Sequence, residues 1–541
     1  MYRSGSSGQL EFPNFYLPFS GHLDPDNRWV AMARLVPWDL AEEIYLESLC
    51  DDFGAPALSA RVALGALLIK ERLGLTDRET VEAIRENPYL QFFLGSEEFS
   101  HERPFDASVM VDFRKRFGEE GLARISEAIA LASVSEAMNP DAVSTPEATD
   151  DRDEPPQVAA TDADSADNAD NADNDGPSNH GKLIVDATCA PADIRYPTDV
   201  SLLNEAREKT EELIDELHAP LVGKQARPRT YRVKARRAFV AFARRKKPNR
   251  KAIRRATRQQ LAFVRRNLEQ IDLLLKNPKA LPLARLSRRL YKNLLVVREV
   301  FRQQLHMFET NTRRVDDRIV SISQPHVRPI KRGKAGRDTE FGAKLSLSVI
   351  DGFSFVDRLN WDNYNESLDL VEQIETYRRR FGFYPESVHA DQIYRTRANR
   401  AYCRQRNIRL SGPPLGRRPQ NVSADEKKQT IADEAIRNSV EGKFGQGKRR
   451  FGLGRIMAKL ASTSAAQISL CFLVMNLELA LRRFFLSLLF ACYRSARRLE
   501  LKPGRSWRSS PRKFTTGHLE NHRRRAKKSL AIVPPTRRWV T

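Results

Sequence analysis

The sequence predicts an α/β fold in which a mixed sheet is interrupted by a long helical insertion and preceded by an all-helical domain. Two changes of pattern carry this prediction. Residues 40–130 show the apolar spacing and capping signals of helices, whereas from Gly181 the chain turns to short apolar runs bounded by turn residues. The insertion, residues 201–312, is helical in character and separates the first of these runs from the later ones.

Length and charge limit the classes of function. A chain of 541 residues has room for two or three domains. Its net charge of +22 favours a polyanionic partner, and nucleic acid over a membrane. The five cysteines share no C-x-x-C spacing, so neither a zinc site nor a disulfide framework is expected. Scattered thiols fit a reducing cytoplasm.

No membrane segment is expected. Residues 1–35 form an N-terminal extension whose polar start is not followed by the apolar core of a signal peptide. The best membrane candidate, Leu460 to Leu477, has six polar residues among eighteen, which favours a buried core helix.

Residues 36–135 are predicted to form a helical DNA-binding domain. Apolar spacing from Ser59 to Leu73 predicts one helix, which Gly74 ends. The capping box Thr76–Glu79 begins the next helix, which Asn87–Pro88 breaks. Helix, short turn and helix is compatible with a helix-turn-helix DNA reader. A helical bundle without groove contact is the alternative.

Residues 136–180 are predicted to be a disordered linker. Thirteen acids and one arginine lie between Glu136 and Asp175, with almost no large apolar residue. Such a segment buries too little surface to offset its ordering entropy. It is a tether, or an acidic strip that competes with DNA for basic surfaces.

Residues 181–480 are predicted to contain the sheet. Candidate strands are 182–187, 192–196, 319–324, 341–350, 353–359, 386–391 and 408–412. Asp351-Gly352 between two of them is a hairpin signal. Candidate helices are 366–381, 395–406, 431–443 and 456–498.

The insertion is strongly basic. Residues 217–268 contain eighteen lysines and arginines and no acid. This composition predicts an arm that binds DNA phosphates, with a solvated face on a helical hairpin as the alternative. The candidate contacts are Arg236, Arg237, Arg244, Arg245, Lys246 and Lys247. Residues 481–541 are predicted to be a helix end and a disordered basic tail that contacts DNA nonspecifically.

Three carboxylates far apart in the sequence are the candidate catalytic and metal-binding residues. Asp186 and Asp391 each end a short apolar run, and Glu441 lies on a helical segment that is predicted to end in a basic, glycine-rich turn. Hard cations prefer oxygen ligands, so the three carboxylates can hold two Mg²⁺ ions. Paired metals stabilise both the attacking and the leaving oxygen of a phosphodiester.

The sequence around these acids resembles the DDE transposases of bacterial insertion sequences. Arg437, Glu441 and Lys448 match the R, E and K of the Y-x2-R-x3-E-x6-K signature, and Glu434 stands where that branch has Tyr. The resemblance covers residues 35–130 and 180–480. Further matching blocks are 181–188, Glu340–Lys344, Trp361–Glu366, His389–Thr396 and Phe451–Arg455.

The resemblance implies a ribonuclease H-like catalytic domain that cleaves and joins DNA at the ends of its own element. It implies two Mg²⁺ ions, with Mn²⁺ as a substitute, where Asp186 bridges both and Asp391 and Glu441 each hold one. Arg437 and Lys448 would contact DNA. It also implies double-stranded DNA as the partner, both element ends and target, a homodimer on DNA and a location in the bacterial cytoplasm at the nucleoid.

Simpler roles remain open for each of these residues. Asp186 and Asp391 could cap turns at strand ends, and Glu441 could pair with Arg437 or Lys443. Arg437 and Lys448 could form salt bridges with Glu434 or Glu441. His389 could orient a ligand or face the core, and Trp361 and Tyr364 could stack on a flipped base or pack in the core.

Two other functions compete with transposition. One is a catalytically inactive DNA-binding relative, which Glu434 in the tyrosine position keeps open. The other is a metal-dependent nuclease without strand transfer. No P-loop, G-x-S-x-G elbow or H-E-x-x-H motif offers different chemistry.

Overall fold

The computed structural model describes residues 21–50, 56–138, 178–331, 339–413, 416 and 423–500, except for the side chains of 135–138, 492 and 494–500. Most of the predicted acidic linker and the C-terminal tail beyond residue 500 lie outside these ranges. The chain up to Phe484 forms one compact unit, and Phe485 begins a second.

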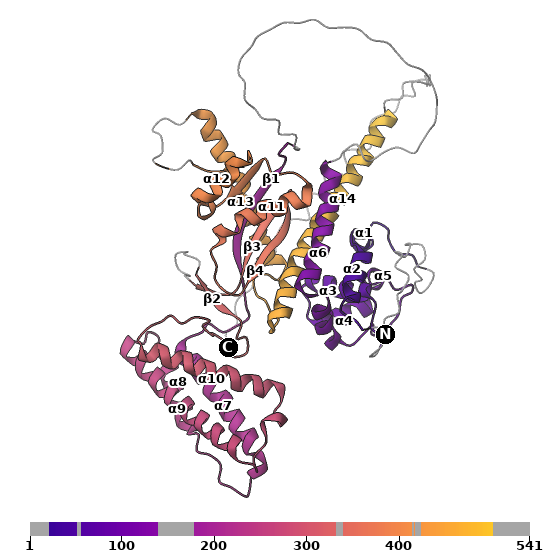
Figure 1. Cartoon of the computed structure of the whole chain (residues 1–541). Helices are drawn as coiled ribbons and strands as arrows, with labels where there is room; N and C mark the ends of the chain where they lie inside the picture. Colours follow the sequence, from indigo (N-terminus) through magenta and orange to yellow (C-terminus); the bar gives the residue numbers. More distant parts are fainter. Residues whose placement is uncertain are drawn as a thin grey trace, which may run out of the picture. The chain divides into compact units, whose positions relative to one another are not determined.

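The N-terminal region is helical, as predicted (Figure 1). Its elements are α1 (Arg28–Leu35), α2 (Trp38–Leu46), α3 (Ala60–Leu73), α4 (Asp77–Glu86), α5 (Pro88–Phe93), η3 (Ala107–Val109) and α6 (Met110–Met138). Thr76 and Glu79 form the predicted capping box of α4, and Gly74 ends α3 in the left-handed conformation. These predictions are confirmed because each depends on contacts within a few residues.

A mixed sheet follows, which confirms the predicted fold class and is consistent with a ribonuclease H-like domain (Figure 1). Its strands are β1 (Lys182–Pro191), β2 (Arg328–Lys331), β3 (Thr339–Ile350), β4 (Phe353–Asn360), β5 (Ser387–Ala390) and β6 (Arg409–Leu410). The order is β2-β3-β1-β5-β6, with β4 also paired to β3. β5 is parallel to β1 and β6, and the pairs of β3 are antiparallel. Asp351 and Gly352 form the predicted hairpin turn between β3 and β4, both with positive φ.

Two predicted strands are wrong. Residues 192–196 make a single bridge, Ala192 with Ile456, and residues 319–324 contain no strand. Ile319 and Ile322 instead belong to the hydrophobic core of the insertion. A short apolar run predicts burial, but it does not distinguish a strand from a buried loop.

The central strand β1 has one open edge. Its pairing with β5 covers only Lys182 to Val185, whereas its pairing with β3 continues from Ile184 to Pro191. Asp186 is therefore the first residue beyond the shared segment. On the β3 side the backbones are close, because a Cβ on Gly342 would lie 2.0 Å from the carbonyl oxygen of Ala190.

The later helices are η7 (Glu366–Leu368), α11 (Leu370–Phe381), η8 (Gln392–Tyr394), α12 (Arg397–Gln405), α13 (Ala424–Arg450) and α14 (Ala461–Glu500). The predicted end of the helix near residue 443 is wrong, since α13 continues through Gly442, Gly445 and Gly447. A Cβ on Gly447 would lie 3.2 Å from Leu453 and from Met475 of α14. Glycine at this position permits close packing and does not mark a turn.

The α14 segment Ala461–Ala491 is the one described helix with the length and hydropathy to cross a membrane. Its most apolar window is 89% buried within the protein. The core-helix interpretation of Leu460 to Leu477 agrees with that burial.

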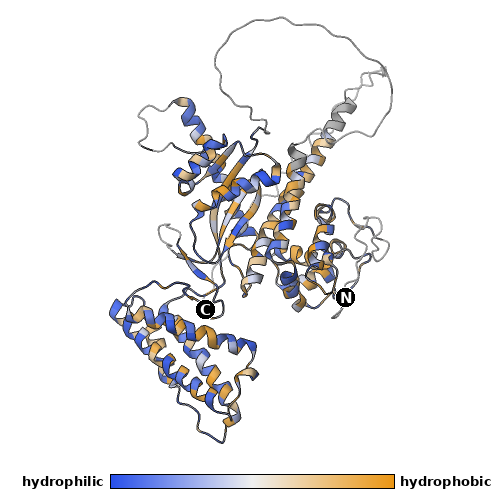
Figure 2. Ribbon diagram, in the orientation of Figure 1, coloured by the Kyte–Doolittle hydropathy of each residue, from blue (hydrophilic) through white to orange (hydrophobic). Residues whose placement is uncertain are grey.

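The insertion consists of helices, as predicted. They are α7 (Asp199–His218), η5 (Ala219–Leu221), α8 (Arg232–Ala243), α9 (Arg250–Lys276), η6 (Leu283–Arg285) and α10 (Arg288–Glu309). Figure 2 shows hydrophobic and hydrophilic residues alternating along these helices. The leucine-rich segments pack together, with Leu213, Val264, Ile271, Val297 and Val300 among the buried residues.

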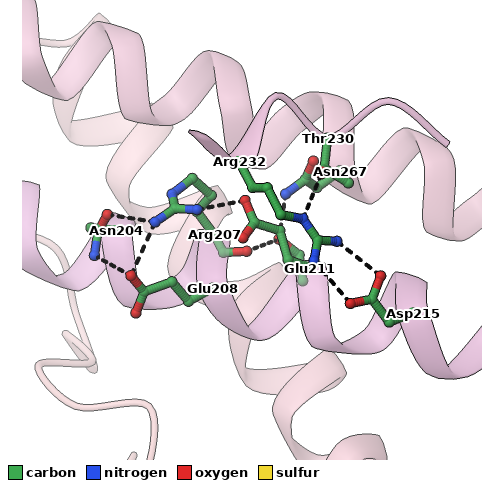
Figure 3. Close-up of polar contacts among 9 residues, drawn as sticks. Asn204, Arg207, Glu208, Glu211, Asp215, Thr230, Arg232 and Asn267 are labelled. Carbon is green, nitrogen blue, oxygen red and sulfur yellow. Dashed lines mark hydrogen bonds and ion pairs between the residues drawn. The ribbon is translucent and has the colours of Figure 1, made fainter. Parts of the chain in front are cut away.

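A buried polar network links α7 to the start of α8 and to α9 (Figure 3). Arg207 is 1% exposed, and it donates to Asn204, Glu208 and Glu211 on its own helix. Asn267 of α9 donates to the hydroxyl of Thr210, which also lies on α7. The bonds of Arg207 give its buried guanidinium acceptors within α7, whereas the bond from Asn267 joins α9 to α7.

Candidate functional site

A pocket of about 620 Å³ lies beside the open edge of β1. Four acidic side chains line it, each from a different segment: Asp186, Glu366, Asp391 and Glu441. Four basic side chains line it as well: Lys331, Lys344, Arg437 and Lys448. The three predicted acids and both predicted cations thus line one pocket, although they are far apart in the sequence.

Asp186 lies on β1 where the pairing with β5 stops. One carboxylate oxygen accepts a hydrogen bond from the backbone N–H of Ala187 at 2.7 Å. Burial, helped by the nearby charges of Asp391 and Glu366, raises the pKa of the Asp186 carboxyl to about 6, although the hydrogen bond from Ala187 works against this shift. Asp186 is therefore a desolvated acid in an environment of negative charge, which a bound cation would relieve.

Asp391 follows the end of β5 and is exposed. Its carboxylate accepts a hydrogen bond from the backbone N–H of Gln392 at 2.7 Å and caps η8. This is the turn-capping contact that the sequence left open as an alternative. It uses one carboxylate oxygen, so the capping contact and a cation contact are compatible.

Glu441 and Arg437 lie one turn apart on α13. Their side chains are 3.6 Å apart, and the side chain of Glu441 is 61% exposed. The ion pair with Arg437 is the alternative role considered for Glu441. Lys443 is not the ion-pair partner of Glu441, because its ammonium lies near Gly352. Burial lowers the pKa of this ammonium.

Helix α13 is fastened to the sheet by Asp433, two turns before Glu441. Its carboxylate accepts two hydrogen bonds from Arg409 of β6, at 2.7 and 3.0 Å. His389 of β5 lies 3.6 Å from the same carboxylate and is fully buried. Burial alone would raise the pKa of Asp433, but hydrogen bonds from Arg409 and Gln429 hold it below its usual value. His389 is thus an inward-facing strand residue that helps to position α13.

The donor set fits a divalent cation, although the described residues contain no ready-made group of three possible metal ligands. Carboxylate oxygens are the ligands that hard cations prefer. Asp186 accepts one backbone hydrogen bond, and burial is the main cause of its raised pKa, so a bound cation would stabilise its ionised form. Asp391 and Glu441 are exposed, so no buried contact fixes their carboxylates.

Sequence reasoning missed Glu366 as a residue of this pocket. Its carboxylate lies 2.6 Å from the ammonium of Lys344. The Trp361–Glu366 and Glu340–Lys344 blocks both resemble the family, and their ends meet here. Nothing in either block by itself indicates that meeting.

The two aromatic candidates are engaged in packing. Trp361 lies edge to face against His326, with ring centroids 4.4 Å apart. Tyr364 lines the pocket, but Arg358 and Lys344 lie over its ring at 4.0 and 4.8 Å. These contacts correspond to the packing alternative.

The basic arm carries cations without acidic partners among the described residues. No lysine or arginine from Lys234 to Arg266 forms an ion pair with any acid of the residues that the structure describes. The six candidate DNA contacts, Arg236, Arg237, Arg244, Arg245, Lys246 and Lys247, are all exposed. Elsewhere in the insertion several arginines are paired with acids, as in Arg289–Glu212, Arg298–Asp272 and Arg302–Glu299.

Comparison with known proteins gives two family matches. Residues 388–478 match a family described as "Transposase DDE domain", a segment that contains Asp391 and Glu441 but not Asp186. Residues 18–116 match a family described as "Transposase domain (DUF772)". No solved structure gives a significant match.

One curated relative is similar to part of the chain. It is the "Uncharacterized protein ORF8 in nfe locus" of Rhizobium meliloti, 39% identical over 116 residues. The alignment covers 21% of this chain and 54% of the relative, so the chain spans about half of the relative's length.

Asp186→Asn is expected to stabilise the metal-free protein. A carboxyl whose folded-state pKa is raised costs stability above its unfolded value near 3.9, and the full cost is present above its folded value of about 6. The amide keeps the oxygen that accepts from Ala187 and removes the charge. Urea unfolding at pH 8 should show a gain of about 2 kcal/mol that shrinks at pH 5. An equal or lower stability at pH 8 would contradict the desolvation argument.

Asp433→Asn is expected to lower the free energy of unfolding by about 1–3 kcal/mol, because the amide keeps one acceptor oxygen for Arg409 but loses the second acceptor and the negative charge. Its neighbour Glu434 is exposed, so Glu434→Gln is a matched control that should change stability by less than about 0.5 kcal/mol. Urea unfolding measures both. Equal effects of the two substitutions would show that the contact of Asp433 does not fasten α13.

Proposed function

We propose that this chain is an insertion-sequence DDE transposase, which binds the ends of its own element and catalyses DNA strand cleavage and strand transfer. The observation that carries the proposal is the pocket beside β1. There Asp186, Asp391 and Glu441 line the same cavity as Arg437 and Lys448.

In this proposal Asp186 contacts two divalent cations, and Asp391 and Glu441 each contact one. The family implies a divalent metal. We propose Mg²⁺, with Mn²⁺ as a substitute, because every donor is a carboxylate oxygen. Bound in pairs, such ions supply stabilisation of the attacking and the leaving oxygen of a phosphodiester.

The protein's own contribution is positioning and charge. No side chain has to act as a covalent nucleophile, because water and then a DNA 3′-hydroxyl attack the phosphodiester. Arg437 lines the pocket one helical turn from Glu441, and Lys448 lines it from the last turns of α13. We propose that the side chains of Arg437 and Lys448 both contact the DNA phosphate next to the scissile bond.

DNA binding is proposed for three further parts. The helical domain, residues 36–135, would contact the element ends, the basic arm would contact phosphates, and residues 481–541 would add nonspecific contacts. We also propose that the protein acts as a homodimer on DNA in the bacterial cytoplasm.

A catalytically inactive DNA-binding relative is the second candidate. Glu434 occupies the tyrosine position of the signature and is exposed on α13. The Y-R-E-K branch thus stays a prediction. Cleavage activity of the purified protein on DNA with the inverted repeats that flank its gene would separate the two functions.

Asp391→Asn is expected to abolish strand cleavage and leave DNA binding nearly intact. The amide still accepts from Gln392, so η8 keeps its cap, but the charge that would hold a cation is removed. Cleavage in Mg²⁺ and gel-shift binding measure the two effects on the same flanking DNA. Asp425→Asn, at a 95% exposed acid on α13, is the matched control and should cleave normally. Full cleavage by Asp391→Asn would place the catalytic acid elsewhere.

Replacing Arg236, Arg237, Arg244, Arg245, Lys246 and Lys247 with Gln is expected to weaken binding to all DNA sequences alike. For each phosphate that the variant no longer neutralises, the plot of log affinity against log salt should flatten by roughly 0.9. Discrimination between element ends and random DNA should stay unchanged, since phosphate contacts carry no sequence information.

The control for the basic arm is the pair Arg289→Gln and Arg302→Gln in the same insertion. Both arginines are exposed, and both are already paired with acids. They should leave the salt slope unchanged. If the arm variant instead loses affinity only for element ends at an unchanged slope, the arm reads bases.

A further inference from the structure

Glu366 reaches the pocket from a part of the chain that the three predicted acids do not use. It begins η7, and the side chain of Asn365 caps this turn by accepting from the backbone N–H of Ser367 at 3.2 Å. Asn399 of α12 donates to the carbonyl oxygens of Ser367 and Tyr394, each at 2.8 Å. The turn that carries Glu366 is therefore bonded to the turn that follows Asp391.

The carboxylate of Glu366 is paired with Lys344 of β3. Their charged atoms are 2.6 Å apart, and their side chains are 19% and 12% exposed. The same ammonium donates to the carbonyl oxygen of Tyr364 at 2.7 Å and lies over the Tyr364 ring. Lys344 is thus a partly buried cation held at the wall of an acidic pocket.

Glu366 acts electrostatically on the same space as Asp186. Burial raises the pKa of Tyr394, and the charges of Glu366 and Asp186 raise it further, so both carboxylates lie near one phenol. Both also line the pocket with Asp391 and Glu441. A fourth carboxylate adds negative charge in a pocket that four basic side chains also line, so it would help to retain divalent cations there.

We propose that Glu366 is a fourth acidic residue of the cation site and that Lys344 competes with the divalent cation for it. This inference rests on the proposed function, because it concerns the same pocket. Without metal, the Lys344–Glu366 pair neutralises Glu366. When a divalent cation binds, the carboxylate of Glu366 adds to the negative charge that retains it, and Lys344 opposes that binding.

A purely structural role for the pair makes a different prediction. If Lys344 and Glu366 only fix the loop of Tyr364 against β3, removal of either charge damages the same contact. Both substitutions would then change metal binding in the same direction. Competition requires opposite directions, because one substitution removes a carboxylate and the other removes its competitor.

The test compares Glu366→Gln with Lys344→Gln in the full chain. Both are charge-removing, and the new amide at 344 can still donate to the Tyr364 carbonyl. Mn²⁺ binding is followed without DNA from the electron paramagnetic resonance signal of the free ion. We expect Glu366→Gln to weaken Mn²⁺ binding about tenfold or more and Lys344→Gln to tighten it about fivefold.

Two controls make the comparison specific. Lys331→Gln removes another cation that lines the pocket, on β2 rather than beside Glu366, so it should tighten binding less than Lys344→Gln. Thermal unfolding without metal checks that each variant is folded. If Glu366→Gln does not fold, Glu366→Asp keeps the charge and should retain most of the affinity.

Weaker binding by both Gln variants would overturn the inference and assign the pair a structural role. An unchanged affinity in Glu366→Gln would also overturn it. Asp391→Asn then shows which proposal has failed. If that variant weakens Mn²⁺ binding, the pocket holds the cation without Glu366; if it does not, the proposed cation site is wrong as well.

Discussion

The contact between Asp433 and its two partners is the constraint on which the candidate site depends. Glu441, Arg437 and Lys448 all lie on α13, whereas Asp186 lies on β1 and Asp391 directly follows the parallel strand β5. The carboxylate of Asp433 joins these two parts, because it accepts two hydrogen bonds from Arg409 of β6 and lies beside the buried His389 of β5. A rotation of α13 by part of a turn would break this contact and carry Glu441 away from the pocket.

The pocket gathers four carboxylates and four basic side chains where the fold has removed part of the solvent. Asp186 is desolvated because it lies on the central strand, and its pKa rises to about 6 as a result. The desolvated carboxylate of Asp186 lowers the stability of the metal-free fold. Such a cost is common at functional sites, where charged groups lie close together. The pocket exists because β5 ends at the level of Val185 while β1 continues to Pro191 along β3. Lys344 and Arg437 offset some of the charge while leaving the four acids accessible.

The insertion uses its charged residues in two ways. Arg207 is buried and bonds to acidic and amide side chains of its own helix, and Asn267 joins α9 to Thr210 of α7 (Figure 3). The cations from Lys234 to Arg266 have no acidic partner among the described residues and are mostly exposed. These cationic side chains lie close together without acidic partners, so they repel one another. A polyanion such as DNA would relieve that repulsion. Arg289 and Arg302, by contrast, are already paired with acids of the insertion.

The sequence by itself determined the elements that rest on short-range contacts. The capping box of α4, the end of α3 at Gly74 and the hairpin at Asp351 were predictable because each depends on neighbouring residues. The three acids were found through their flanking residues, and their catalytic role stays a proposal. The tertiary structure alone decided that Ile319 packs in the insertion core and that α13 continues through its glycines. It also decided that Glu366 joins the pocket, because long-range packing brings η7 and β3 to the same place, and no local pattern encodes that meeting.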